Sequence, residues 1–164
     1  MQSSFFPVMA IIMVSIATAS CQKENPKQTV EELEQTAGDS ASGSILVINI
    51  TGIKSVKGVI NVALFNSAST FNTEKAFRTM IAEITSSYME IQFDSIPPDT
   101  YAFAVFHDEN ANGKLDQNVL GIPKEGFAFS NNAMGGFGPP NFSQASFFIP
   151  EKSKLTQTVS LKYY

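Results

Sequence analysis

The chain has 164 residues, of which 11 are Lys or Arg and 15 are Asp or Glu, so its formal net charge is −4. Only 16 % of the residues are charged, Phe occurs 14 times and Trp is absent. This composition argues against nucleic-acid binding, which requires a clustered basic surface. It suits one compact β domain of about 120 residues with aromatic packing.

The first element is an apolar run over residues 5–19, which begins almost at the N-terminus and ends in small residues. It is too short for a comfortable membrane span, and the pattern is typical of a signal peptide. The usual basic start is missing, because residues 1–4 contain no Lys or Arg. We nevertheless expect an exported protein with residues 1–21 as its signal segment.

Two cleavage sites compete at the end of this segment. Ala17-Thr18-Ala19 fits ordinary signal peptidase, whereas the residues from Thr18 to Cys21 resemble the bacterial lipobox, with Thr18 in place of the usual Leu. Cys21 is the only cysteine, and a single free thiol is unusual in an exported protein. Lipidation would consume that thiol and anchor the chain by burying methylenes, at about 0.8 kcal/mol each. We therefore expect a membrane-anchored lipoprotein of the cell envelope, with a periplasmic or secreted protein as the alternative.

Residues 22–43 read QKENPKQTVEELEQTAGDSASG and contain few sizeable apolar side chains. Such a stretch buries too little surface to offset the entropy of ordering it. We interpret it as a flexible tether, which leaves residues 44–164 as the folded domain.

Alternation of apolar and polar residues dominates from Ser44 onward and predicts about seven strands. The expected strands cover residues 45–50, 59–65, 77–84, 88–93, 101–106, 146–149 and 155–163. The third and fourth are expected to form a hairpin around Ser86-Ser87, and Thr73-Glu74 indicates a short helix within residues 70–76. The fold class is therefore all-β, an Ig-like or prealbumin-like antiparallel sandwich with one long loop excursion over residues 121–141.

The segment from Asp108 to Asp116 places oxygen-bearing side chains at every second position and a glycine after the third. The candidate calcium ligands are Asp108, Asn110, Asn112, Asp116 and the backbone carbonyl of Lys114. This spacing matches the first nine positions of an EF-hand loop, in which a tight curl turns alternate side chains towards a cation that prefers six to eight oxygens. The strand expected before it excludes a true EF-hand with flanking helices.

The twelfth position of this loop, normally a bidentate Glu, is Val119. Further ligands would then come from Asp99, Glu109, Glu125, a backbone carbonyl or water. Together with the two Asn ligands, this predicts a weak and mainly structural site, with a dissociation constant of about 10⁻⁴–10⁻³ M. The loop also resembles the calcium loops of adhesin repeats. The alternative is an Asn/Gly-rich turn whose side chains cap its own backbone.

Catalysis finds little support in the sequence. His107 is the only histidine, which disfavours a zinc site, and no Gly-x-Ser-x-Gly motif accompanies it. We therefore expect a binding or structural role towards an unidentified envelope or extracellular partner. The alternative is a small-ligand or hydrolytic site built by residues 121–141 with His107 and Glu125. Three Phe residues could line it or pin the loop to the core: Phe127, Phe129 and Phe137.

A long series of motifs runs through residues 101–147. It comprises His107-Asp108-Glu109-Asn110, Asn112-Gly113, Leu115-Asp116, Gly121-Ile122-Pro123, Glu125-Gly126, Ser130-Asn131-Asn132 and Gly138-Pro139-Pro140. With these motifs, and Lys57-Gly58 before a strand ending in Leu64-Phe65, residues 44–164 resemble the bacterial family called domain of unknown function 2141. The resemblance implies an exported β-sandwich. It implies no activity, because the family's function is uncharacterised.

Overall fold

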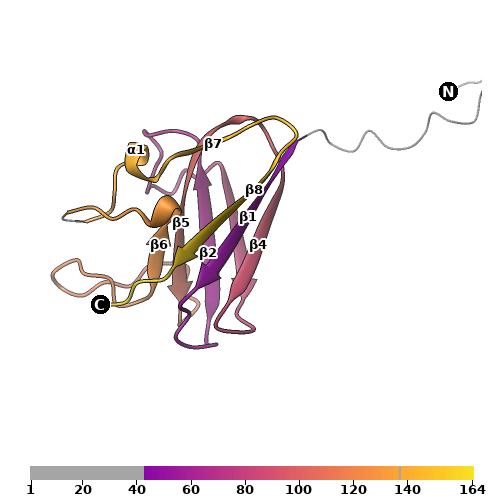
Figure 1. Ribbon diagram of the computed structural model, residues 1–164. Helices are drawn as coiled ribbons and strands as arrows, with labels where there is room; N and C mark the ends of the chain where they lie inside the picture. Colours follow the sequence, from indigo (N-terminus) through magenta and orange to yellow (C-terminus); the bar gives the residue numbers. More distant parts are fainter. Residues whose placement is uncertain (1–42, 137) are drawn as a thin grey trace, which may run out of the picture. The chain divides into compact units, whose positions relative to one another are not determined.

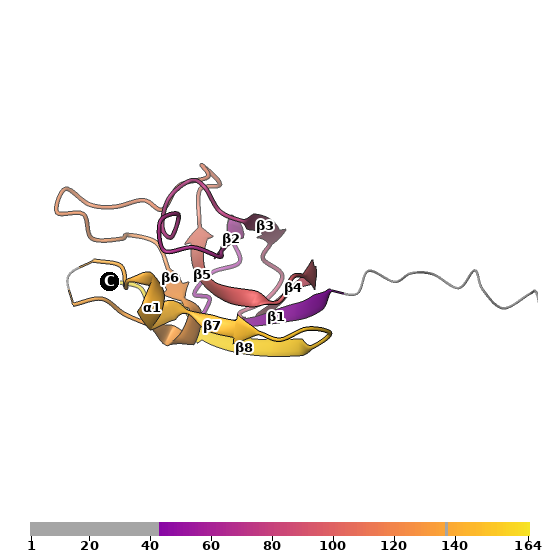
Figure 2. The same ribbon diagram turned by 90° about the horizontal axis from the view of Figure 1, so that it is seen from above.

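A computed structural model describes residues 43–136 and 138–164 of the chain. Its strands form two packed sheets, which appear as two layers in Figures 1 and 2. The strands are β1 Ser44–Thr51, β2 Val59–Phe65, β3 Arg78–Glu83, β4 Met89–Ile96, β5 Asp99–Asp108, β6 Phe127–Phe129, β7 Phe147–Ile149 and β8 Lys154–Ser160. The all-β sandwich is confirmed. The predicted signal segment with Cys21, and all but the last residue of the predicted tether, lie outside the described residues.

One sheet has the strand order β4-β1-β8, and the other has the order β3-β2-β5-β6, with β7 also paired to β5. Every pair is antiparallel except β1 with β8, which runs parallel from Ile45 opposite Lys154 to Thr51 opposite Ser160. The first strand of the domain is therefore completed on one side by the last.

The hairpin predicted around Ser86-Ser87 is wrong, because β3 and β4 belong to different sheets. Alternation identifies a strand and its apolar face but not its partner, and both strands direct their apolar residues into the shared interior from opposite sides. Arg78 on β3 spans the gap. Its guanidinium donates to the backbone oxygens of Asp94 at 2.5 Å and Ser95 at 3.2 Å.

The helix predicted within residues 70–76 is also wrong, because this stretch forms successive turns. The hydroxyl of Thr73 donates to the carbonyl of Thr70 at 2.6 Å instead of capping a helix. The single α-helix among the described residues is α1, Phe142–Ala145, which begins with a capping box between Asn141 and Gln144. No helix in the described part of the chain is long and apolar enough to cross a membrane.

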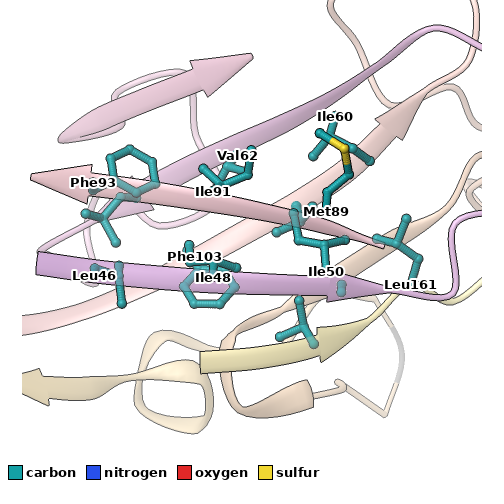
Figure 3. Close-up of a cluster of buried hydrophobic side chains, with 14 of the residues drawn as sticks. Leu46, Ile48, Ile50, Ile60, Val62, Met89, Ile91, Phe93, Phe103 and Leu161 are labelled. Carbon is teal, nitrogen blue, oxygen red and sulfur yellow. The ribbon is translucent and has the colours of Figure 1, made fainter. Parts of the chain in front are cut away.

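Two apolar clusters cover the two faces of the five-stranded sheet. The inner cluster fills the space between the sheets, as Figure 3 shows for Ile48 on β1 and Phe103 on β5. The outer cluster lies on the opposite face and includes Phe65, Ala102, Phe127 and Phe129. Because both faces of β5 are covered, residues 101–106 form a nearly continuous apolar run instead of a simple alternation.

The strand β6 was not predicted, because it lies within the expected loop excursion of residues 121–141. It is only three residues long and all three are buried, so it offers no alternation to detect. Its first and last residues, Phe127 and Phe129, pack into the outer cluster. These rings therefore pin the excursion to the sheet, while Phe137 lies outside the described residues.

Candidate functional site

The segment between β5 and β6 projects from the end of the sandwich opposite to the start of β1 (Figures 1 and 2). Its position follows from the strand register. Asp108, the last residue of β5, pairs with Val59, the first residue of β2. A short connection joins Val59 to the end of β1, so the loop after β5 lies at the end of the sandwich where β1 finishes. We call residues 109–126 the β5–β6 loop.

Asp108 lies at the base of this loop and is 1 % exposed. Its Oδ1 accepts the amide N–H of Asn112 at 3.0 Å, and its Oδ2 accepts the amide N–H of Gly113 at 2.7 Å. The side-chain amide of Asn61, on the neighbouring strand β2, donates to the same Oδ2 at 3.4 Å. One buried carboxylate thus curls the first turn of the loop around itself.

Glu125 closes the loop from its other end and is 5 % exposed. Its Oε1 accepts the amide N–H of Glu109, and its Oε2 accepts the amide N–H of Asp116, both at 2.9 Å. Within the described residues neither Asp108 nor Glu125 forms an ion pair with Lys or Arg. A buried carboxylate ordinarily has a cationic partner or a metal in addition to hydrogen bonds.

Three predicted ligand side chains converge above these two carboxylates. The Asp116 carboxylate accepts the side-chain amides of Asn110 at 2.8 Å and Asn112 at 3.2 Å. Asn112 also accepts the backbone N–H of Lys114, whose side chain is exposed. The amide nitrogens thus face Asp116, whereas the amide oxygens of Asn110 and Asn112 accept backbone N–H groups. These contacts are those of the alternative prediction, a turn whose side chains cap its own backbone, built from residue types that a hard cation also binds. No group of three or more His, Cys, Asp or Glu suited to a metal occurs in residues 43–136 and 138–164, so the acidic part of the set is limited to two side chains.

The other residues considered as further ligands differ in their distance from the loop and in their exposure. Asp99 begins β5 and Asp108 ends it, so about 30 Å of strand separates Asp99 from the loop and removes it as a ligand. Glu109 lies in the loop with its side chain 41 % exposed. Val119 is fully exposed and takes no part in the oxygen cluster. Glu125 contacts the loop through the N–H groups of Glu109 and Asp116, but among the described residues it forms no metal-binding group with Asp108 and Asp116.

His107, one residue before Asp108, is completely buried. Its Nε2 lies 2.8 Å from the carbonyl oxygen of Lys57, which can only accept, so Nε2 carries the proton. Its Nδ1 lies 2.8 Å from the hydroxyl of Tyr163, which donates to it in the neutral form of the ring. The ring connects β5 to the segment before β2 and to the C-terminal residues.

Two glycines allow these segments to approach each other. Gly58 has φ +72°, and a Cβ there would lie 1.9 Å from the backbone oxygen of Asp108. A Cβ on Gly126 would lie 2.3 Å from the ring of Tyr163, which packs against this position. Any larger residue at either point would separate the strands that position His107 and Asp108.

The Ser130-Asn131-Asn132 motif serves as a second polar connector. The hydroxyl of Ser130 is fully buried, accepts the amide N–H of Phe103 at 2.9 Å and donates to the carbonyl of Ala145 at 2.6 Å. The side chain of Asn132 pairs with the free edge of β8 by donating to the carbonyl of Thr158 and accepting the N–H of Ser160, both at 3.0 Å. These contacts occupy edge groups of a strand that would otherwise be open.

The tip of the β5–β6 loop is a tight turn with an apolar surface. The side-chain oxygen of Asn118 accepts the amide N–H groups of Leu120 at 2.9 Å and Ile122 at 3.0 Å. The backbone N–H of Asn118 donates to the carbonyl of Ile122 at 2.8 Å. Leu120 is 79 % exposed and Ile122 is 40 % exposed. The turn is held by polar contacts, while its aliphatic side chains face water.

Sequence reasoning missed the residues that support this site from outside the loop. Asn61 interrupts the apolar strand 59–65, and a polar residue in that position is a usable signal for a neighbouring buried polar group. Tyr163 and the carbonyl of Lys57 left no comparable signal, because their contact with His107 depends on the packing of distant segments.

The predicted alternative of a hydrolytic site loses its basis in this geometry. His107, Asp108 and Glu125 are all buried, and hydrogen bonds to protein groups occupy both nitrogens of the ring and every oxygen of the two carboxylates. A general acid or base must instead reach a proton of the substrate. The arrangement favours bracing of the loop over proton transfer.

Comparison with known proteins identifies a family for most of the folded domain. The family model DUF2141, described as an uncharacterized protein conserved in bacteria, matches residues 48–157. No curated protein and no solved structure gives a match. The matched residues include all eight strands except the ends of β1 and β8, together with the whole β5–β6 loop.

Proposed function

The chain belongs to DUF2141, a family of uncharacterised bacterial proteins, and from that premise we propose that it is a lipid-anchored, exported β-sandwich whose β5–β6 loop is braced by calcium. Its role is binding or structural rather than catalytic. One observation supports the metal: Asp108 and Glu125 are buried without a cationic side-chain partner among the described residues.

The charge balance of the loop supports a cation in this place. Two buried carboxylates and the partly buried Asp116 lie within a short segment, and backbone N–H groups satisfy their hydrogen bonds but carry no net charge. Taking carboxylates out of water is costly unless an opposite charge compensates. A calcium ion held by Asp108, Asn110, Asn112, Asp116 and the backbone carbonyl of Lys114, with water completing its shell, supplies that charge.

Thermal unfolding with and without calcium tests the metal. For a dissociation constant of about 10⁻⁴–10⁻³ M, calcium at about 10 mM stabilises the folded state by roughly 1.4–2.7 kcal/mol. That stabilisation raises the melting temperature by about 5 °C or more relative to chelator. Magnesium gives a smaller shift, because it demands a tighter octahedral shell. An unchanged melting temperature at millimolar calcium rules the metal out.

The variant Asp116→Asn keeps the shape of the side chain and removes one ligand charge, so its calcium-dependent shift should disappear. Asp94→Asn, at an exposed position of β4, is the matched control and should retain the shift of the natural protein. An equal shift in both variants would mean that calcium binds elsewhere.

Mass spectrometry of the mature N-terminus tests the lipid anchor. We expect a diacylated or triacylated Cys21 as the first residue, and we expect the chain in the membrane fraction. The variant Cys21→Ser should release the protein into the soluble fraction of the envelope. An unmodified N-terminus that begins directly after Ala19 would contradict lipid anchoring and would show that the protein is secreted without lipid.

A further inference from the structure

The tip of the β5–β6 loop presents three aliphatic side chains within four residues. Val119 is 101 % exposed, Leu120 is 79 % exposed and Ile122 is 40 % exposed. Isolated exposed aliphatic residues are common on protein surfaces, but a contiguous group at the end of a projecting loop marks an interaction site. The side chains of this group are not used in folding, because the tip is held by the polar contacts of Asn118.

The tip is also preorganised. Besides the three contacts of Asn118, Gln117 and Pro123 form a β-bridge across the loop, and the N–H of Lys124 donates to the carbonyl of Asp116 at 2.8 Å. The loop therefore keeps its apolar end displayed and loses little further conformational entropy on binding.

The size of the tip distinguishes between partners. It carries three exposed aliphatic side chains, whereas a stable protein–protein interface buries about 800 Å² on each partner. A bilayer interface requires no matching pocket and accepts aliphatic side chains from a projecting loop. The exposed Lys114 and Lys124 lie on the same loop as Glu109, Asp116 and Glu125, so the charge of the loop does not attract it to anionic headgroups, and insertion depends on the apolar tip.

We infer that Val119, Leu120 and Ile122 insert into a lipid surface, in the same membrane that holds the anchor at Cys21. This inference rests on the proposed lipid anchoring, which keeps the domain close to a bilayer and makes a weak second contact effective. The loop and the start of β1 lie at opposite ends of the sandwich (Figure 1). Residues 22–43 extend to at most about 75 Å, more than the roughly 30 Å length of β5. The domain can therefore turn its loop end to the membrane.

A fluorescent label at the tip tests the insertion directly. The chain with Leu120→Cys is purified from membranes, labelled with a polarity-sensitive fluorophore and placed in vesicles of phosphatidylethanolamine and phosphatidylglycerol. We expect emission at shorter wavelength and quenching by lipids with nitroxide-labelled acyl chains. A label at Glu151→Cys, an exposed position before β8 at the other end of the sandwich, should stay in water.

A tip label that behaves like the label at position 151 would overturn the inference. A tip label shielded only in intact cells would assign the tip to a protein partner and would likewise overturn it. The anchor is scored separately by the number of labels per chain. One label means that Cys21 is blocked, and two labels mean that its thiol is free, in which case the tip is measured in the chain that also carries Cys21→Ser.

Binding without the anchor supplies a second test. The exported Cys21→Ser chain should co-sediment weakly with the same vesicles, and Leu120→Asp should reduce its bound fraction at least tenfold. The control Ser87→Asp, in the exposed turn between β3 and β4, adds the same charge and should leave binding unchanged. Equal binding by both variants would contradict insertion of the tip.

Discussion

Between its two sheets the protein buries aliphatic and aromatic side chains, whereas at the β5–β6 end it buries two carboxylates and an imidazole. The first region is stabilised by removing apolar surface from water. The second is stabilised by specific hydrogen bonds, such as those of Asp108 and Glu125 to backbone N–H groups. Apolar packing tolerates adjustment, but each buried polar group depends on particular partners. The two regions should therefore respond differently to substitution.

The largest effect is expected for Phe103→Ala in the inner cluster. Phe103 is fully buried, and truncating a buried Phe costs about 3–5 kcal/mol in the free energy of unfolding. Chemical denaturation should show this loss in a single cooperative transition, because the ring lies between both sheets. A loss below about 1 kcal/mol would mean that the space between the sheets is loosely packed.

Removal of Glu125 should have a smaller and more local effect. Glu125→Ala leaves the N–H groups of Glu109 and Asp116 without their acceptor, at a cost of about 1–3 kcal/mol. Amide hydrogen exchange should accelerate across the β5–β6 loop while β1 and β2 stay protected. Glu125→Gln keeps one carbonyl acceptor, so its free energy of unfolding should lie between those of the natural protein and Glu125→Ala. Equal acceleration across all strands would erase the distinction between the regions.

Tyr163→Phe should lower the free energy of unfolding and change how that free energy depends on pH. The variant leaves Nδ1 of the buried His107 without its donor, at a cost of about 1–3 kcal/mol near neutral pH. Burial raises the pKa of Tyr163 above its usual 10.0; the N–H of Lys54 opposes this shift, and the nearby charge of Glu109 adds to it.

The sign of the pH effect follows from that raised pKa. The folded protein holds the phenol proton more tightly than the unfolded chain does, so this contribution to stability is complete below about pH 10 and is lost as pH rises through the folded-state pKa. Denaturation curves from about pH 9 to pH 12 should therefore fall less steeply for Tyr163→Phe than for the natural protein. Parallel curves would contradict this assignment.

The smallest effect on stability is expected at the tip. Leu120→Ser removes an aliphatic side chain that is 79 % exposed, and such surface changes usually stay within about 0.5 kcal/mol. Thermal unfolding of the isolated protein should be unchanged or slightly improved. A clear destabilisation would show that the tip contributes to folding, and it would weaken the case for a binding surface.

The same contrast separates what the sequence predicts from what it does not. Period-two alternation, which follows from burying one face of a strand, together with apolar runs bounded by turn signals, identified seven of the eight strands. It could not identify the partners of β3 and β4, nor the three-residue β6. The Asp108–Asp116 spacing predicted either a calcium loop or a self-capped turn. The hydrogen bonds of the turn are present because local side-chain contacts follow sequence distance, and calcium binding stays a prediction. Contacts such as Tyr163 with His107 join residues far apart in the chain and leave no local pattern.

The parallel pairing of β1 with β8 has a consequence for the order in which the molecule forms. The first strand of the domain lacks one of its two neighbours until residues 154–160 have been synthesised, and contacts between such distant segments slow folding. A nascent chain therefore completes its core only late in synthesis and remains unfolded for longer. Under the proposed export, an extended chain with this topology would complete its core only after its last strand had crossed the membrane.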